Sequence, residues 1–211
     1  MYALSEDEIS SLKPLFAQFS LPDLEKEWYW NLPPIEEYIY IYKRREYRKG
    51  GQPVDYSKFL VQFHYHQEKE GNCEREVAVR FNLYHDSTRS LVLTYDECPL
   101  GIVGFDPRVL RSSRRQALVV NQIQGMRYKG STVEGPARSV LWQPALLNLV
   151  VVFGSVFGAE EVDVIPYNKN KWSRVKYNEN GNADRIYDGT ASNCGFLYNK
   201  RRQLWVRKLH V

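Results

Sequence analysis

An uncharged apolar segment from Ser139 to Ala159 constrains the fold of this chain more than any other feature. It contains no Asp, Glu, Lys or Arg, and its length approaches that of a membrane span. Gln143, Pro144 and Asn148 interrupt its first half, and Gly158 ends it directly before a strand-like stretch. These features favour a buried helix of about 14 residues with Pro144 in its first turn, rather than a membrane span.

Period-two alternation of apolar and polar residues dominates the middle of the chain. Two such runs, 59–66 and 77–84, flank a polar stretch with a glycine and predict a long antiparallel hairpin. Shorter strands are expected at 90–95 and 100–105, and the stretch 116–124 is the strongest strand candidate. The pattern therefore predicts a sheet that is largely antiparallel in this half.

The back half of the chain alternates strands with helices. The expected order after the strand at 116–124 is a glycine-bearing loop, the apolar helix, a strand at 162–165, a helix near 182–193 and a last strand at 203–209. Antiparallel strands followed by a β-loop-α-β unit predict an α+β protein with a central mixed sheet. We expect residues 1–55 to form a helical and aromatic preface and 56–211 to form the core domain of a single compact unit.

The net charge and the cysteine content place only weak limits on the function. A net charge of +4 and a pI near 8.8 tolerate an anionic partner without requiring one. The three cysteines are odd in number and widely spaced, so they give no disulfide framework and no zinc-site spacing. The acidic stretch before the first expected helix has no basic or apolar segment, so we expect no signal peptide there. We therefore expect a cytoplasmic protein that binds no metal.

The loop that follows the strand at 116–124 combines glycines with basic residues. Gly125 and Gly130 allow backbone amides to approach an anion, and a following helix N-terminus favours negative charge. Arg127 and Lys129 add fixed positive charge. By itself such a loop is more often an ordinary turn than an anion site.

The order of elements over 116–209 resembles the cofactor-binding half of the GNAT acyltransferase superfamily. That family binds pyrophosphate on a loop of pattern (Gln/Arg)-x-x-Gly-x-(Gly/Ala), and Arg127 and Gly130 stand at the matching spacing, with Thr132 in place of the last small residue. Asn168 follows the strand at 162–165, where such proteins often carry an asparagine. A VirK-like domain of unknown function, with a comparable strand ending in Gln-Gly, is also similar.

The resemblance implies a GNAT-like fold that binds acetyl-CoA or another acyl-CoA, a phosphorylated small-molecule cofactor, and transfers the acyl group to an amine. The cofactor-binding residues that it implies are Val120, Asn121, Gln122, Arg127, Lys129, Gly130, Ser131, Thr132 and Asn168. Tyr187, or else Tyr198, would be the general acid. The general base would come from Glu97, His64 or His85, because proton transfer needs a titratable group.

Three alternatives stay open. The same fold could serve without catalysis as a module that recognises a protein partner. Basic, aromatic-bearing clusters at 42–49 and 200–208 could bind nucleic acid, although a solvated turn and strand edge explain them better. His64 and His66 share one strand face and could bind a metal, but we expect solvent-facing histidines there.

Overall fold

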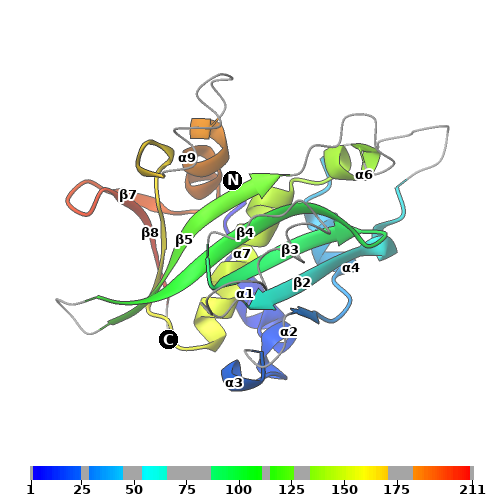
Figure 1. Cartoon of the computed structure of the whole chain (residues 1–211), viewed down its shortest axis with the longest axis horizontal. Coiled ribbons are helices and arrows are strands. Elements are labelled where there is room, and N and C mark those ends of the chain that lie inside the picture. Colours follow the sequence, from blue (N-terminus) through cyan, green and yellow to red (C-terminus); the bar gives the residue numbers. More distant parts are fainter. Residues whose placement is uncertain are drawn as a thin grey trace, which may run out of the picture.

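The computed structural model describes residues 2–24, 29–44, 54–65, 87–110, 115–125, 134–170 and 183–209 (Figure 1). Its helices are α1 (Glu6–Leu12), α2 (Pro14–Ala17), α3 (Leu21–Leu24), α4 (Glu36–Ile41), α6 (Glu134–Ser139), α7 (Trp142–Val156) and α9 (Ala183–Asn193), with 3₁₀ turns η1 (Tyr56–Lys58) and η2 (Tyr167–Lys169). Its strands are β1 (Tyr29–Asn31), β2 (Phe59–Tyr65), β3 (Arg89–Tyr95), β4 (Cys98–Leu110), β5 (Arg115–Gly125), β6 (Glu161–Val164), β7 (Leu197–Asn199) and β8 (Leu204–Lys208).

The described strands form one sheet in the order β1-β2-β3-β4-β5-β6-β8-β7. Neighbours from β1 to β5 are antiparallel, β5 and β6 are parallel, and β6, β8 and β7 are antiparallel again. The expected α+β architecture with a mixed, largely antiparallel sheet is confirmed. The parallel pair is the one joined by the β-loop-α-β unit, because parallel neighbours need a crossover connection.

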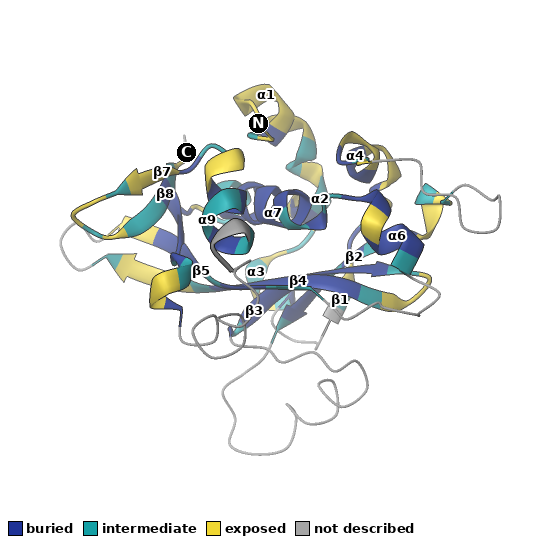
Figure 2. Ribbon diagram, turned by 90° about the horizontal axis from the view of Figure 1, so that it is seen from above, coloured by how far each residue is buried: buried dark blue, intermediate teal, exposed yellow. Residues whose placement is uncertain are grey.

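Helix α7 is the predicted buried helix, and Pro144 lies in its first turn. Twelve of its fifteen residues are buried, because it packs against the sheet on one side and against α1, α2 and α9 elsewhere. Figure 2 shows it between the sheet and α1. A helix that is apolar all round suits such a position. Among the described residues, no helix is long and apolar enough to cross a membrane.

Asn148 is the polar exception in α7 and ties both ends of the chain to it. Its side-chain nitrogen donates to the Tyr2 carbonyl at 2.6 Å and to the Tyr42 hydroxyl at 2.8 Å. Its oxygen accepts from Arg207 Nη1 at 3.3 Å, and Arg207 also donates to the carbonyls of Leu4 and Cys194. The predicted preface thus packs against the same helix as the core.

One expectation for β2 lies outside the described residues, and another is wrong. The strand predicted at 77–84 lies outside the described residues, and the structure pairs β2 with β3 on one edge and with β1 on the other. His64 of β2 is buried instead of facing solvent. It lies opposite Tyr29 and Ser90 on the neighbouring strands, and its Nε2 lies 3.2 Å from Gln62 Oε1.

Candidate functional site

The parallel strands β5 and β6 pair over only four residues and then part. Their register runs from Ala117–Glu161 to Val120–Val164, and the Ile165 amide closes it by donating to the Val120 carbonyl at 3.0 Å. β6 ends there, whereas β5 continues to Gly125. Among the described strands, only β4 pairs with this continuation. We call the β6-facing side of residues 121–125 the splay edge of β5.

A β-bulge marks the start of the splay edge. Gly104 pairs with Gln122 and Phe105 pairs with Val120, so Asn121 is an extra residue on β5. An extra residue shifts the alternation of the strand and re-aims its backbone groups. As a result, the Asn121 carbonyl and the Ile123 amide both meet side chains that come from the far side of the splay edge.

Tyr187 supplies the first of these contacts from α9. Its hydroxyl accepts from the Ile123 amide at 3.0 Å, and its side chain is only 4% exposed. Ala191, one helical turn further on, is fully buried on the same face of α9. The helical repeat therefore turns Tyr187 toward β5, where it meets the Ile123 amide.

Asn170 supplies the second contact, from the end of η2. Its side-chain nitrogen donates to the Asn121 carbonyl at 2.5 Å, and it is 5% exposed. The short turn begins after Pro166, whose carbonyl accepts from the Asn170 amide at 3.2 Å and so fixes the position of this residue. Asn168, the asparagine predicted from the sequence, is exposed on the same turn.

A polar cluster on the sheet holds the bulge residue itself. The Asn121 side-chain nitrogen donates to Asp106 Oδ2 at 2.8 Å, and the Ser87 hydroxyl donates to its oxygen. Asp106 also accepts from the amide and the hydroxyl of Thr88, at 2.7 and 2.8 Å. Because these bonds occupy the Asn121 side chain, only its backbone carbonyl serves the splay edge.

The two other predicted backbone positions have different roles in the sheet. The Val120 carbonyl belongs to the β5–β6 ladder, where it accepts from Ile165. The Gln122 side chain is buried and donates to Gln124 Oε1 at 3.2 Å. Sequence reasoning missed Ile123 and Asn170, because the bulge and the 3₁₀ turn that position them leave no periodic signal.

The other candidate acids and bases that the structure describes lie on elements other than α9 and β5. Tyr198 is 44% exposed on β7 and packs on Trp205. β7 and β2, which carries His64, each lie three strands from β5, or about 14 Å at ordinary strand spacing. Glu97 is exposed in the turn between β3 and β4, with a φ of 64°.

The predicted phosphate loop lies outside the described residues, as does His85. The predicted cofactor-binding residues in that loop are Arg127, Lys129, Gly130, Ser131 and Thr132. The structure places its two flanks, the end of β5 at Gly125 and the start of α6 at Glu134. Gly125 ends the splay edge, and a Cβ at this glycine would lie 2.9 Å from the Trp142 ring at the start of α7.

An ion cluster on β6 fixes the β7–β8 hairpin beside the site. Arg202 Nη1 lies 2.6 Å from Glu161, its Nη2 contacts Asp163, and Lys208 Nζ lies 3.0 Å from Glu161. Burial raises the pKa of Asp163 to about 6, although Arg202 opposes the shift. Burial also acts to raise the pKa of Glu161, but hydrogen bonds from Lys208 and Arg202 hold it below its usual value.

The basic clusters are largely committed to internal contacts where the structure describes them. Tyr42 is buried and bonded to Asn148. In the second cluster, Arg202 and Lys208 pair with Glu161, and Arg207 bonds to backbone carbonyls. These contacts support the interpretation of residues 200–208 as a turn and strand edge, in preference to a nucleic-acid-binding surface. Within the described ranges, no group of three His, Cys, Asp or Glu side chains is arranged to hold a metal ion.

Comparisons with known proteins give distant likenesses only. No family model and no curated protein sequence matches the chain. Among solved structures, Arabidopsis thaliana Naa50 in complex with the bisubstrate analogue CoA-Ac-MVNAL is 12% identical, covers 72% of this chain and 99% of its own, and superposes with a TM-score of 0.35.

A mutant AtaT toxin bound to the C-terminus of the antitoxin AtaR is 12% identical, with a TM-score of 0.33. The match covers 57% of this chain and 65% of the toxin. The same complex with acetyl-CoA is 11% identical, with coverages of 57% and 66% and a TM-score of 0.31. The chain thus spans slightly less than two thirds of the toxin. The strand order and the parallel β5–β6 pair that separates after Val120 agree with the fold expected from the GNAT resemblance.

Proposed function

We propose that the protein binds an acyl-CoA at the splay edge of β5 and transfers the acyl group to an amine. The observation that carries this proposal is the contact of 3.0 Å between the Ile123 amide and the Tyr187 hydroxyl. It joins a backbone donor to a proton-bearing side chain at the point where two parallel strands part. Acyl transfer needs both kinds of group close together.

The splay edge offers the hydrogen-bonding pattern that an amide-bearing chain requires. Asn121 presents a carbonyl and Ile123 an amide, and an extended ligand can pair with such groups as an added strand does. In this structure Asn170 and Tyr187 supply the complementary amide and hydroxyl. Both are side-chain groups, so a ligand with the same two groups can replace them. The residues present therefore fit the pantetheine arm of an acyl-CoA.

The chain's own residues then have separable roles. The Ile123 amide would donate to the carbonyl oxygen of the thioester, where negative charge develops during attack by the amine. The Tyr187 hydroxyl would protonate the departing thiolate. Bound acyl-CoA supplies the activated acyl group. Arg127, Lys129, Gly130, Ser131 and Thr132 remain our predicted contacts to its phosphates, and the cysteine pattern favours the reducing cytoplasm as the compartment.

A second candidate function is a partner-binding module of the same fold without catalysis. The observation that favours it is the occupation of both splay-edge groups by Asn170 and Tyr187. An edge that is closed by its own side chains does not need a cofactor to satisfy its backbone. On this reading any acyl-CoA that binds would not be turned over.

Binding and turnover of acetyl-CoA distinguish the two functions. Calorimetric titration should show saturable binding to the unmodified protein and none to Arg127→Glu or Gly130→Glu. Thiol release from acetyl-CoA with a panel of amines should fall in Tyr187→Phe and stay unchanged in Tyr198→Phe, which alters an exposed tyrosine on β7. Absence of binding at millimolar acetyl-CoA excludes the acyltransferase, and binding without thiol release favours the module.

A further inference from the structure

A pocket opens between the α1–α2 corner and α4. Its volume is about 350 Å³, and most of its lining side chains are apolar. Two exposed carboxylates from the first turn of α4 complete the lining. Ligand pockets commonly measure about 300–1,000 Å³, so this one has room for a side chain of a partner. We call it the acidic groove, and its lining includes Leu12, Leu15, Pro34, Ile35, Glu36 and Glu37.

The exposed face of α4 extends the acidic groove. Glu37 and Ile41 lie one helical turn apart and so share a face, and the Ile41 side chain is 61% exposed. Tyr40 is exposed as well, but Lys43 Nζ lies 5.0 Å from the centre of its ring and the Tyr56 ring packs against it. Exposed apolar surface bordered by polar groups marks interaction sites. Ile41 therefore adds apolar contact area beside the groove.

The β7–β8 hairpin carries the complementary combination of side chains. Leu197 of β7 is 78% exposed, and Lys200 and Arg201 in the loop are exposed too. Neither of these two cations forms an ion pair with another described residue. Tyr198 packs on the Trp205 ring, so Leu197 is the projecting apolar residue of the hairpin. An apolar side chain beside two positive charges matches an apolar groove beside two negative charges.

The hairpin loop is held in one conformation. The Gln203 amide donates to the Asn199 carbonyl at 2.7 Å, and the Arg202 amide donates to Asn199 Oδ1 at 3.0 Å. The Arg202 guanidinium also pairs with Glu161 and Asp163 of β6. A surface that is ordered before contact loses little conformational entropy on binding. The hairpin is therefore suited to insert into a partner.

The hairpin and the acidic groove lie toward opposite ends of the molecule. Figures 1 and 2 both show β7 and β8 at one end and α4 toward the other. The hairpin therefore reaches the groove of another copy and not its own. Like charges oppose contact of hairpin with hairpin and of groove with groove, and the net charge of +4 opposes association by other surfaces.

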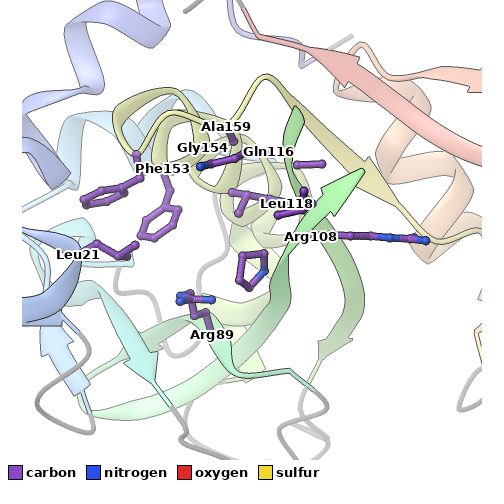
Figure 3. A pocket seen from close by; sticks show the side chains of 12 residues that line it. Leu21, Arg89, Arg108, Gln116, Leu118, Phe153, Gly154 and Ala159 are labelled. Atoms are coloured by element: carbon purple, nitrogen blue, oxygen red, sulfur yellow. The ribbon is translucent and has the colours of Figure 1, made fainter. Parts of the chain in front are cut away.

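A second pocket, of about 300 Å³, does not match the hairpin. It lies between α7, α3 and strands β4 and β5 (Figure 3). Arg89 and Arg108 both line it, so the cations of the hairpin would meet charge of the same sign there. Like charges across an interface disfavour a contact. Of these two pockets, the acidic groove is the one that suits the hairpin.

We propose that the protein associates with itself head to tail, with the β7–β8 hairpin of one copy docked in the acidic groove of the next. Leu197 enters the apolar part of the groove. Lys200 and Arg201 face the two carboxylates of α4. Each contact leaves a hairpin and a groove unused, so the association continues into chains or closes into rings. Exposed ion pairs contribute little, which makes the association weak and dependent on protein concentration.

Sedimentation velocity from micromolar to millimolar protein tests the proposal. We expect the average mass to rise with concentration and to fall on addition of salt, because salt screens exposed charges. A monomer at every concentration, or association that strengthens with salt, overturns the proposal. Association that disappears after nuclease treatment also overturns it, because bound nucleic acid would then join the copies.

Two charge-reversed variants identify the surfaces. Glu36→Lys with Glu37→Lys, and Lys200→Glu with Arg201→Glu, should each weaken the association about tenfold or more. An equimolar mixture of the two should restore it, because every hairpin then meets a groove of opposite charge on the other variant. A mixture that stays monomeric contradicts the proposal.

Two single variants separate apolar contact from charge. Leu197→Ser should weaken the association and leave its salt dependence unchanged, because both cations of the hairpin remain. Lys169→Glu alters an exposed lysine of η2 and should leave the association intact. Unchanged association in a folded Leu197→Ser protein, or a loss in Lys169→Glu as large as in the hairpin variant, overturns the proposal.

Discussion

Removal of the Tyr187 hydroxyl is the sharpest perturbation of the proposed site. The hydroxyl accepts from the Ile123 amide at 3.0 Å, and both residues are buried. Tyr187→Phe keeps the ring and removes the acceptor, which leaves the amide without this bond. An unsatisfied buried polar group costs about 1–3 kcal/mol. We therefore expect the free energy of unfolding to fall by about 2 kcal/mol, equivalent to roughly 4–8 °C in Tm.

The same substitution should separate binding from chemistry. If a ligand carbonyl takes the Ile123 amide from Tyr187, the hydroxyl competes with the ligand for this donor. Removal of the competitor should leave the Kd for acetyl-CoA unchanged or lower it. Loss of a general acid should at the same time lower kcat by about a hundredfold or more. A tyrosine that only shapes the binding surface would instead raise Kd and leave kcat nearly constant.

The free energy of unfolding can be measured by urea titration with tryptophan fluorescence as the signal, with and without saturating acetyl-CoA. The destabilisation of Tyr187→Phe should shrink when the ligand is present, because the ligand supplies the missing acceptor. Tyr198→Phe is the control, since Tyr198 is exposed and retains its ring contact with Trp205. A Tyr187→Phe protein as stable as the unmodified one would refute the hydrogen bond on which the reasoning rests.

Other predictions concern the framework of the site. Gly101→Ala should lower stability by about 1–3 kcal/mol, because its Cβ would lie 2.4 Å from the buried Trp142 ring. Asn148→Ala should cost about 3 kcal/mol, because several buried polar groups lose one partner. The pKa of Asp163 is raised from 3.8 to about 6, so its contribution to stability is present at low pH and is lost as the pH rises through that window; Asp163→Asn should flatten this part of the pH profile. Arg202→Met should destabilise by about 3 kcal/mol above the Asp163 pKa and by less below it.

Chemical denaturation over a pH series checks all four, and two variants serve as controls. A Cβ at Gly158 would meet no atom within 4 Å, so Gly158→Ala should cost only the strain of its φ of 76°. Arg201→Met changes an exposed neighbour of Arg202 and should have little effect. Stability of Arg202→Met that is independent of pH would contradict the coupling with Asp163.

The elements with a continuous pattern were predictable from the sequence. α7 was found because its apolar character extends around the whole helix, which only a buried position accommodates. β5 was found because most of its residues from Ala117 to Ile123 are apolar and none of them is glycine or proline. By contrast, β1 has only three residues, Tyr29–Asn31, too few for a period to show. Its pairing with β2 depends on tertiary packing.

Of the residues at the candidate site, only those included in the family pattern could be predicted from the sequence. The resemblance singled out Tyr187, and the structure brings its hydroxyl to β5. It could not give Ile123, because the bulge at Asn121 shifts the strand by one residue without a sequence signature. Asn170 was missed in favour of Asn168, because the choice between them depends on the turn η2 that follows β6.

The most direct test of the central claim is the amide resonance of Ile123 during titration with acetyl-CoA. Our account predicts a saturable shift of this resonance in the unmodified protein, at the same ligand concentrations that produce binding heat. It also predicts a saturable shift in Tyr187→Phe, where the amide no longer has the tyrosine as a competitor. An Ile123 amide that does not respond at millimolar acetyl-CoA would contradict acyl-CoA binding at the splay edge of β5.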